Sequence, residues 1–84
     1  MRYIAVFDED ALRALLAVRG VRRREKLLDV IAALAKDPFQ EGDFTTVDKT
    51  GRPVQLRVVG KFVLSYWPDH GAKELRIIDL QSAE

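Results

Sequence analysis

The chain has 84 residues, of which 48% are hydrophobic and 32% are charged, and its formal net charge is +1. This composition is typical of one small globular domain and excludes a largely disordered chain. The absence of cysteine excludes disulfides and thiolate metal sites, and a single histidine excludes a metal site built on several imidazoles. We therefore expect one domain over residues 1–84, with no metal and no cofactor.

No apolar run approaches the length that a membrane-spanning helix needs. Met1-Arg2 leads directly into a strand pattern instead of the apolar core of a signal peptide. These features predict a cytoplasmic protein without membrane association.

The N-terminal segment predicts a strand followed by a helix. Tyr3–Phe7 is an almost continuous apolar run, which is typical of a strand covered on both faces. Asp8-Glu9-Asp10 supplies a candidate N-cap and negative charge for the first turn of a helix, which continues through Val18. Gly20 is expected to follow the end of this helix as its C′ residue.

A second helix is predicted from about Arg22 to Lys36, because its apolar residues recur at the spacing of one buried stripe. Asp37-Pro38 is expected to end it, since proline restricts the preceding residue and cannot donate a backbone hydrogen bond. We expect the two helices to form an antiparallel hairpin. The stripe consists of Leu27, Val30, Ile31 and Leu34.

The C-terminal half predicts consecutive strands. Phe44–Val47 has β-branched and aromatic character, and the turn Asp48–Gly51 separates it from a longer β segment, Pro53–Trp67. A second turn is predicted at Trp67–Gly71, and a last strand at Glu74–Leu80. The predicted fold class is therefore α+β with two layers: an N-terminal strand, a helical hairpin and an antiparallel β-meander.

The segment Pro53–Trp67 is predicted to be a hairpin centred on Gly60. Period-2 alternation suggests that Val58 lies opposite Phe62, with a three-residue loop of Val59, Gly60 and Lys61. The core face would then hold Val54, Leu56, Val58, Phe62, Leu64 and Tyr66. The opposite face would present Gln55, Arg57, Val63 and Ser65 to solvent.

This order of elements resembles the RelE/ParE toxin superfamily over nearly the whole chain. The resemblance depends on Asp37-Pro38-Phe39, Gly42, the segment from Pro53 to Tyr66 and the segment from Glu74 to Leu80. It implies a toxin of a bacterial type II toxin–antitoxin system, of the kind linked to plasmid stabilisation. RelE-like members cleave messenger RNA in the ribosomal A site without a metal, and ParE-like members poison DNA gyrase. The implied partners are a cognate antitoxin and either the ribosome with its mRNA or DNA gyrase.

The resemblance carries over to Arg57, Lys61 and Tyr66, which match basic and tyrosine positions of the family's central strands. Two departures accompany these matches. Val63 stands where RelE-like nucleases usually have a catalytic arginine, and Gln81-Ser82-Ala83-Glu84 replaces their basic and tyrosine C-terminal residues. A metal-free ribonuclease needs a base, cations and an acid, so these departures make nuclease activity doubtful and leave the catalytic residues unknown.

Cations and one tryptophan form the predicted RNA- or target-binding set, with aromatic stacking and phosphate contacts as the expected chemistry. The alternative is a solvated sheet face on which these long side chains only cover apolar surface. The set is Arg57, Lys61, Arg76, Trp67, Lys49 and Arg52.

Three further positions are candidates with ordinary alternatives. Arg22-Arg23-Arg24 lies at the unfavourable end of a helix dipole and is a candidate antitoxin contact, unless Glu25 and Asp29 offset it through i,i+3 and i,i+4 pairs. His70 and Tyr66 are weaker candidates, since a histidine in a turn and a buried tyrosine are both common structural features.

Two other functions remain open from the sequence. One is a non-enzymatic protein- or RNA-binding module that keeps the toxin fold without its catalytic residues. The other is a self-associating protein, because the small core and apolar helices would suit a homodimer.

Overall fold

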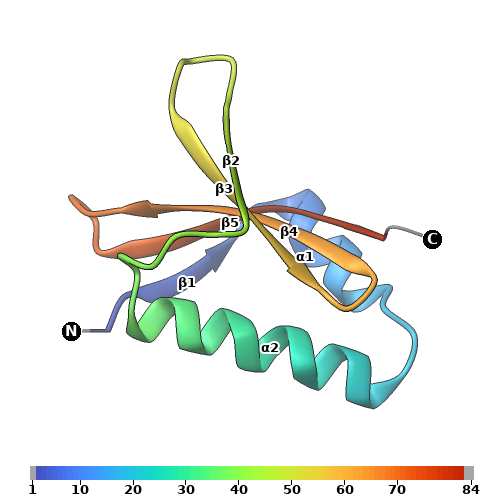
Figure 1. The fold of residues 1–84 in the computed structure, drawn as a ribbon. Helices are drawn as coiled ribbons and strands as arrows, with labels where there is room; N and C mark the ends of the chain where they lie inside the picture. Colours follow the sequence, from blue (N-terminus) through green and yellow to red (C-terminus); the bar gives the residue numbers. More distant parts are fainter. Residues whose placement is uncertain (1, 83–84) are drawn as a thin grey trace.

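In the computed structural model, which describes residues 2–82, two helices pack on one face of a five-stranded sheet (Figure 1). The predicted α+β class and the predicted order of elements are confirmed. In chain order the elements are β1 (Ile4–Phe7), α1 (Glu9–Leu16), α2 (Val21–Lys36), β2 (Phe44–Val47), β3 (Pro53–Val59), β4 (Phe62–Asp69) and β5 (Glu74–Ser82). No helix among these residues is long and apolar enough to span a membrane.

The sheet has the strand order β1-β5-β4-β3-β2. Strands β2 to β5 form the predicted antiparallel meander, and β1 pairs in parallel with β5 at the far edge. Because β1 is an edge strand with a helix on one side only, Ile4 is 70% exposed. The prediction that Tyr3–Phe7 is covered on both faces is therefore wrong.

The core lies between the helices and the sheet face that they cover. α1 packs mainly on β5, whereas α2 contacts β1, β3 and β5. Burying one aliphatic side chain fully stabilises the folded state by about 1.5–3 kcal/mol relative to leaving it exposed. This packing therefore holds the helices on the sheet. The largest fully buried side chains are Leu27 and Leu34 of α2, Leu64 and Tyr66 of β4, and Leu75 and Ile77 of β5.

The boundary between the helices differs from the prediction. α1 ends at Leu16 with Ala17 as its C-cap, and Gly20 instead precedes α2 with a φ of 95°. A positive φ is accessible to glycine without steric cost. Asp8 is the N-cap residue of α1, but its side chain makes no cap hydrogen bond and lies 3.4 Å from Arg76.

The register of the β3–β4 hairpin is shifted by one residue from the predicted one. Val59 pairs with Phe62 and Val58 with Val63, so the connecting turn is Gly60-Lys61 only, and Gly60 has a φ of 61°. Val59 is 5% exposed and Val58 is 48% exposed. The prediction failed because Val58 and Val59 are both apolar, and alternation alone cannot decide which one enters the core.

This shift exchanges the two faces of β3 relative to β4. Residues directly opposite each other on paired strands lie on the same face. Arg57 pairs with Leu64 and therefore lies on the helix-covered face, whereas Leu56 and Val58 lie on the other face. The prediction that Arg57 points outward from the uncovered face is wrong. The side of the sheet without helices is called the open face below.

Strand β4 continues through Trp67-Pro68-Asp69, where a turn was predicted. The β3–β4 pairing ends at Gln55 and Tyr66, so Pro68 lies beyond the part of β4 that pairs with β3. Pro68 still pairs with Leu75 of β5, but the other side of β4 has no strand partner at this position, and proline is tolerated at such an edge. The β4–β5 pairing contains an irregularity next to Tyr66, where the partner changes from Asp79 to Ile77.

Candidate partner-binding face of the sheet

The open face carries an exposed apolar strip across β2, β3 and β4. Phe44 pairs with Leu56, and Val58 pairs with Val63, so these four side chains share this face. Phe44 is 62% exposed and Val58 is 48% exposed, although both are large apolar residues. A contiguous exposed apolar surface of this kind is characteristic of a protein-binding site.

Trp67 lies on the open face with a guanidinium already over its ring. The Arg52 Cζ atom is 4.0 Å from the ring centroid, which is a cation–π contact. Arg52 also approaches Asp48, with 3.7 Å between Nη1 and Oδ2. The predicted stacking surface is therefore occupied on one side by the protein's own arginine.

Arg76 lies on the same face, directly opposite Trp67 in the β4–β5 pairing. Its guanidinium is 3.3 Å from a Glu74 carboxylate oxygen and 3.4 Å from an Asp8 carboxylate oxygen. A phosphate binding here would have to compete with two carboxylates for one cation. Arg76 is thus already neutralised by Glu74 and Asp8, which makes this end of the open face a poor anion-binding site.

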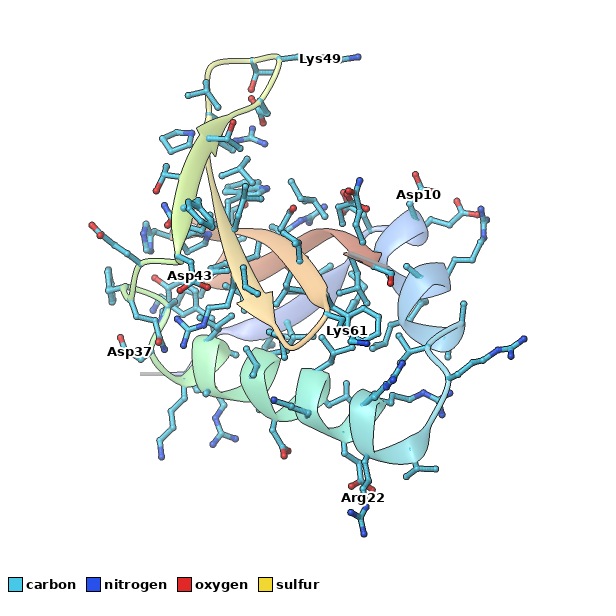
Figure 2. All side chains as sticks on the ribbon, turned by 45° about the vertical axis from the view of Figure 1, so that its right-hand side comes forward. Asp10, Arg22, Asp37, Asp43, Lys49 and Lys61 are labelled. Carbon is cyan, nitrogen blue, oxygen red and sulfur yellow. The ribbon has the colours of Figure 1, made fainter. Side chains whose placement is uncertain are left out.

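The β2–β3 turn holds the next candidate, Lys49, at the tip of a hairpin that projects away from the sheet (Figure 1). Asp48 Oδ1 accepts hydrogen bonds from the Thr50 hydroxyl, the Thr50 N–H and the Arg52 N–H at 2.7, 2.8 and 3.0 Å. These bonds, that of the Thr50 hydroxyl first, lower the pKa of Asp48 below its usual value. Lys49 extends from the tip of this turn (Figure 2).

The loop between α2 and β2 is fastened to β3. The Gly42 N–H donates to Gln55 Oε1 at 2.8 Å, and the Val58 N–H donates to Asp43 Oδ2 at 2.7 Å. The Arg57 Nη1 atom lies 3.4 Å from the Glu41 carbonyl oxygen. Arg57 is therefore directed toward this loop, and it does not belong to the open face.

Tyr66, on the same side of the sheet as Arg57, is 1% exposed. Among the described residues its hydroxyl has no hydrogen-bond partner. Burial raises the pKa of Tyr66 above its ordinary value of 10.0, and this outweighs the opposing effect of Arg57. The phenol is thus neutral at physiological pH and has no access to a substrate on the open face.

Tyr66→Phe is expected to raise the free energy of unfolding at pH 7 by about 1 kcal/mol, because a buried unpaired hydroxyl costs about 1–3 kcal/mol. The raised pKa means that the neutral phenol favours the folded state below pH 10 and that this contribution is lost as the pH rises through the folded-state pKa. The variant should therefore lose less stability than the wild type in alkaline solution. Urea denaturation at pH 7 and above pH 10 measures both effects.

Tyr3→Phe is the matched control for this change. The Tyr3 hydroxyl is hydrogen-bonded to His70 Nδ1 at 2.7 Å, so its removal should cost about 0.5–1.5 kcal/mol. Equal destabilisation by the two substitutions would show that the Tyr66 hydroxyl has a partner in solution.

His70 belongs to an aromatic cluster at the β4–β5 turn. Besides its hydrogen bond to Tyr3, its ring stacks on Phe39 with a centroid distance of 4.9 Å and an interplanar angle of 10°. These contacts join the β4–β5 turn to the start of β1 and to the α2–β2 loop. They indicate a structural role for His70.

The remaining cationic candidates lie at two other places. Lys61 is exposed in the β3–β4 turn, whereas Arg22, Arg23 and Arg24 lie at the start of α2. Arg24 Nη2 donates to the Val18 carbonyl at 2.9 Å. For Arg22 and Arg24, the ion pairs that the structure shows within residues 2–82 do not include the predicted pairs with Glu25 and Asp29.

The structure thus divides the predicted binding set. It brings Arg52, Trp67 and Arg76 together on the open face, and it places Arg57 on the other face and Lys49 and Lys61 at two turns. Within residues 2–82 there is no group of three or more His, Cys, Asp or Glu side chains that could hold a metal ion. Gln81 and Ser82 extend β5, and Ala83 and Glu84 of the predicted C-terminal departure lie outside the described residues.

Comparison with known proteins supports the fold but gives no match in sequence. No protein-family model matches the chain, and no curated protein matches it significantly. Among solved structures, it is similar to the isolated Escherichia coli RelE toxin, with a TM-score of 0.80, 20% identity and coverage of 98% of this chain and 85% of that one.

Two toxin–antitoxin complexes contain similar chains. The archaeal RelE–RelB complex from Pyrococcus horikoshii gives a TM-score of 0.78 at 14% identity, covering 99% of this chain and 97% of that one. The RelBE2 complex from Mycobacterium tuberculosis gives 0.79 at 17% identity, covering 98% and 99%. The chain therefore has the RelE-like fold over nearly its whole length, as the sequence resemblance predicts.

Proposed function

We propose that this chain is the toxin-type component of a bacterial type II toxin–antitoxin pair, and that a cognate antitoxin protein binds and neutralises it in the cytoplasm. The observation that carries the proposal is the almost complete overlap of its fold with RelE toxins. Two of the similar chains were solved in complexes with their antitoxins. A similar fold at such low sequence identity does not identify the cellular target, so we infer the target from the properties of the surface.

The open face is the proposed surface for the cellular target. Its exposed apolar strip, which includes Phe44 and Val58, suits a protein surface better than a nucleic-acid backbone. The cations that share this face, Arg52 and Arg76, are already compensated by carboxylates. We therefore favour inhibition by binding to a protein of the translation machinery or to DNA gyrase.

A second candidate function is a non-enzymatic binding module with a toxin fold. A specific observation favours it over a ribosome-dependent nuclease: Arg57 faces the α2–β2 loop, and Val63 occupies the open face opposite Val58. Metal-free RNA cleavage requires a base, an acid and cations around one phosphate. The described residues of the open face do not bring a base and an acid together around a cation that is free of carboxylate partners.

Expression in a bacterial host, with and without the open reading frame adjacent to this gene, tests the first proposal. We expect growth inhibition by the chain alone and relief, with a co-purifying complex, when the neighbour is present. Phe44→Asp should abolish the inhibition without unfolding the protein, because Phe44 is 62% exposed on the open face. Val47→Asp is the control, since Val47 is equally exposed but has the opposite orientation in β2.

Absence of both the growth defect and the complex would reject the toxin proposal. Incubation of the purified chain with ribosome-bound messenger RNA distinguishes the non-enzymatic binding module from a ribosome-dependent nuclease. Cleavage that disappears in Arg57→Ala would reject the non-enzymatic function.

A further inference from the structure

Strand β2 is an edge of the sheet, and its outer side has no strand neighbour within residues 2–82. All four of its residues are exposed, and Phe44 and Val47 are each 62% exposed. The hairpin that β2 forms with β3 extends to the end of the molecule opposite α2 (Figure 1). The outer side of β2 is therefore accessible to another molecule.

One backbone hydrogen bond shows which groups of β2 point outward. The Asp48 N–H donates to the Arg52 carbonyl oxygen at 2.9 Å, so the backbone groups of Asp48 face the β3 side. Along an antiparallel strand, the backbone groups of successive residues point alternately to one side and to the other. Those of every second residue back to Phe44 therefore also face β3. The N–H and C=O groups of Thr45 and Val47 point to the outer side.

The side chains of β2 do not protect this edge. Natural proteins commonly block an exposed edge with a charged residue, a proline or a β-bulge. The strand Phe44–Val47 contains no charged residue and no proline, and it pairs with β3 residue for residue. Its aromatic and β-branched residues are the types that are enriched in strands. β2 therefore has the properties of an edge that accepts a further strand.

A second copy of β2 fits this edge. Residues that exchange hydrogen bonds lie directly opposite each other in an antiparallel pair. If Thr45 of one copy lies opposite Val47 of the other, a two-fold axis passes through Thr46, and the outward groups of both strands are paired. Threonine opposite threonine is a favourable cross-strand pair, and Asp43 of one copy lies toward Lys49 of the other, which is an attractive pair of charges.

We propose that the chain forms a homodimer in which two β2 strands pair antiparallel and join two five-stranded sheets into one sheet of ten strands. An extended segment of another protein could pair with the same backbone groups. The opposite charges of Asp43 and Lys49, which flank β2, favour a reversed copy of the same strand. Asp48 also follows β2, but its carboxylate accepts hydrogen bonds from Thr50 and Arg52 within its own turn.

The proposed pairing leaves the open face of each copy uncovered. Directly opposite residues lie on the same face of a sheet, so the two open faces would lie on one side of the ten-stranded sheet. Their apolar strips would then be neighbours, because Phe44 belongs to both the strip and β2. The dimer would thus present two copies of the strip side by side. This inference does not depend on the proposed function.

Single-cysteine variants test the position of the two-fold axis. The chain has no cysteine, so a disulfide in such a variant can only join two chains. In the proposed pairing, the two Thr46 residues form a non-hydrogen-bonded pair with Cα atoms about 4.5 Å apart, a distance that a disulfide spans. We expect Thr46→Cys to give a covalent dimer under mild oxidation, measured on a non-reducing gel.

Phe44→Cys is the matched control, because Phe44 is exposed on the same face two residues away from the axis. The two Cα atoms at this position would be about 14 Å apart, which is too far for a disulfide. Equal cross-linking of the two variants would overturn the proposed pairing, since random collision does not distinguish the positions.

Sedimentation equilibrium of the full chain tests the dimer without a cross-link. A pairing of two short strands is a small interface, so we expect a reversible dimer whose average mass rises with concentration toward twice the 9.6 kDa of one chain. Val47→Pro removes one outward N–H from each copy and should raise the dissociation constant by about tenfold or more. Val47→Thr keeps this N–H and should change the constant by less than about threefold.

Both variants should keep the fold of the single chain, because the Val47 N–H points away from β3, and circular dichroism verifies this. An average mass that stays at that of one chain up to about 1 mM would overturn the proposal and leave the β2 edge to a strand of another protein. Equal dissociation constants for Val47→Pro and Val47→Thr would also overturn it, because they would place the interface elsewhere.

The growth assay gives a separate answer about the toxin function. A monomeric chain that inhibits growth would reject only the homodimer. A dimeric chain that does not inhibit growth would support the homodimer and reject only the toxin proposal.

Discussion

Leu64→Ala is expected to lower the free energy of unfolding by about 2–5 kcal/mol, the largest effect of any single truncation that we propose. Leu64 is 0% exposed at the centre of β4, where β3 and β5 pair on either side and the helices cover the face. The truncation removes apolar contacts and leaves a cavity that the paired backbone cannot close. Because small domains have a total stability of only about 5–15 kcal/mol, the variant should be near the limit of folding.

Urea denaturation followed by Trp67 fluorescence and by circular dichroism measures this loss. Val58→Ala is the control, since Val58 is 48% exposed on the open face, and we expect it to cost less than about 0.5 kcal/mol. A loss above about 1 kcal/mol for Val58→Ala would show that Val58 is buried in solution, as the other register of the hairpin requires.

Gly42→Ala is expected to lower the free energy of unfolding by about 1–3 kcal/mol, as other overpacked sites do. A Cβ atom at this position would lie 2.6 Å from the Leu56 carbonyl oxygen and 3.1 Å from the Leu56 nitrogen. These are backbone atoms of a paired strand and cannot move aside. The α2–β2 loop would have to lift, which would break the hydrogen bond from Gly42 to Gln55 and disturb the one between Val58 and Asp43.

Gly71→Ala is the matched control for this substitution. The nearest atom to its added Cβ would be an Asp69 carboxylate oxygen at 3.5 Å, an ordinary contact. The alanine should be neutral or should stabilise by about 0.4–1 kcal/mol through the unfolded chain. Thermal and urea unfolding of the two variants compare them directly, and equal stabilities would refute the close approach of the loop to β3.

Local patterns in the sequence were sufficient to predict the order of elements. The buried stripe of α2 and its end before Pro38 depend on contacts within one segment, and β2 has the predicted bounds Phe44–Val47. Pairing between strands that lie far apart in the sequence could not be predicted from such local patterns. Nothing in Tyr3–Phe7 indicates that it pairs in parallel with β5 and forms an edge.

The hairpin register illustrates the limit of periodicity. Val58 and Val59 satisfy alternation in two different registers, and Gly60 fits the turn in both. The choice is made by helix packing, which buries Val59 and exposes Val58. Since Arg57 lies next to this pair, the same ambiguity reversed its predicted face.

The candidate sites were predicted by residue type but not by environment. A cation in the sequence does not reveal whether a carboxylate from a distant strand compensates it, as Asp8 does for Arg76. The free edge of β2 is likewise invisible in the sequence, because it depends on the order of all five strands in the sheet. The run of basic residues after Gly20 was visible, and only the structure shows that Arg24 donates to the Val18 carbonyl.

The parallel pairing of β1 with β5 has a consequence for folding during synthesis on the ribosome. Ile4 pairs with Glu74, so β1 has no sheet neighbour until β5 has been synthesised. Closing so long a loop is a slow step, because its entropy is lost before the contact forms. A nascent chain released before residue 74 would therefore have β1 unpaired, and the sheet of this domain would be complete only after β5 has left the ribosome.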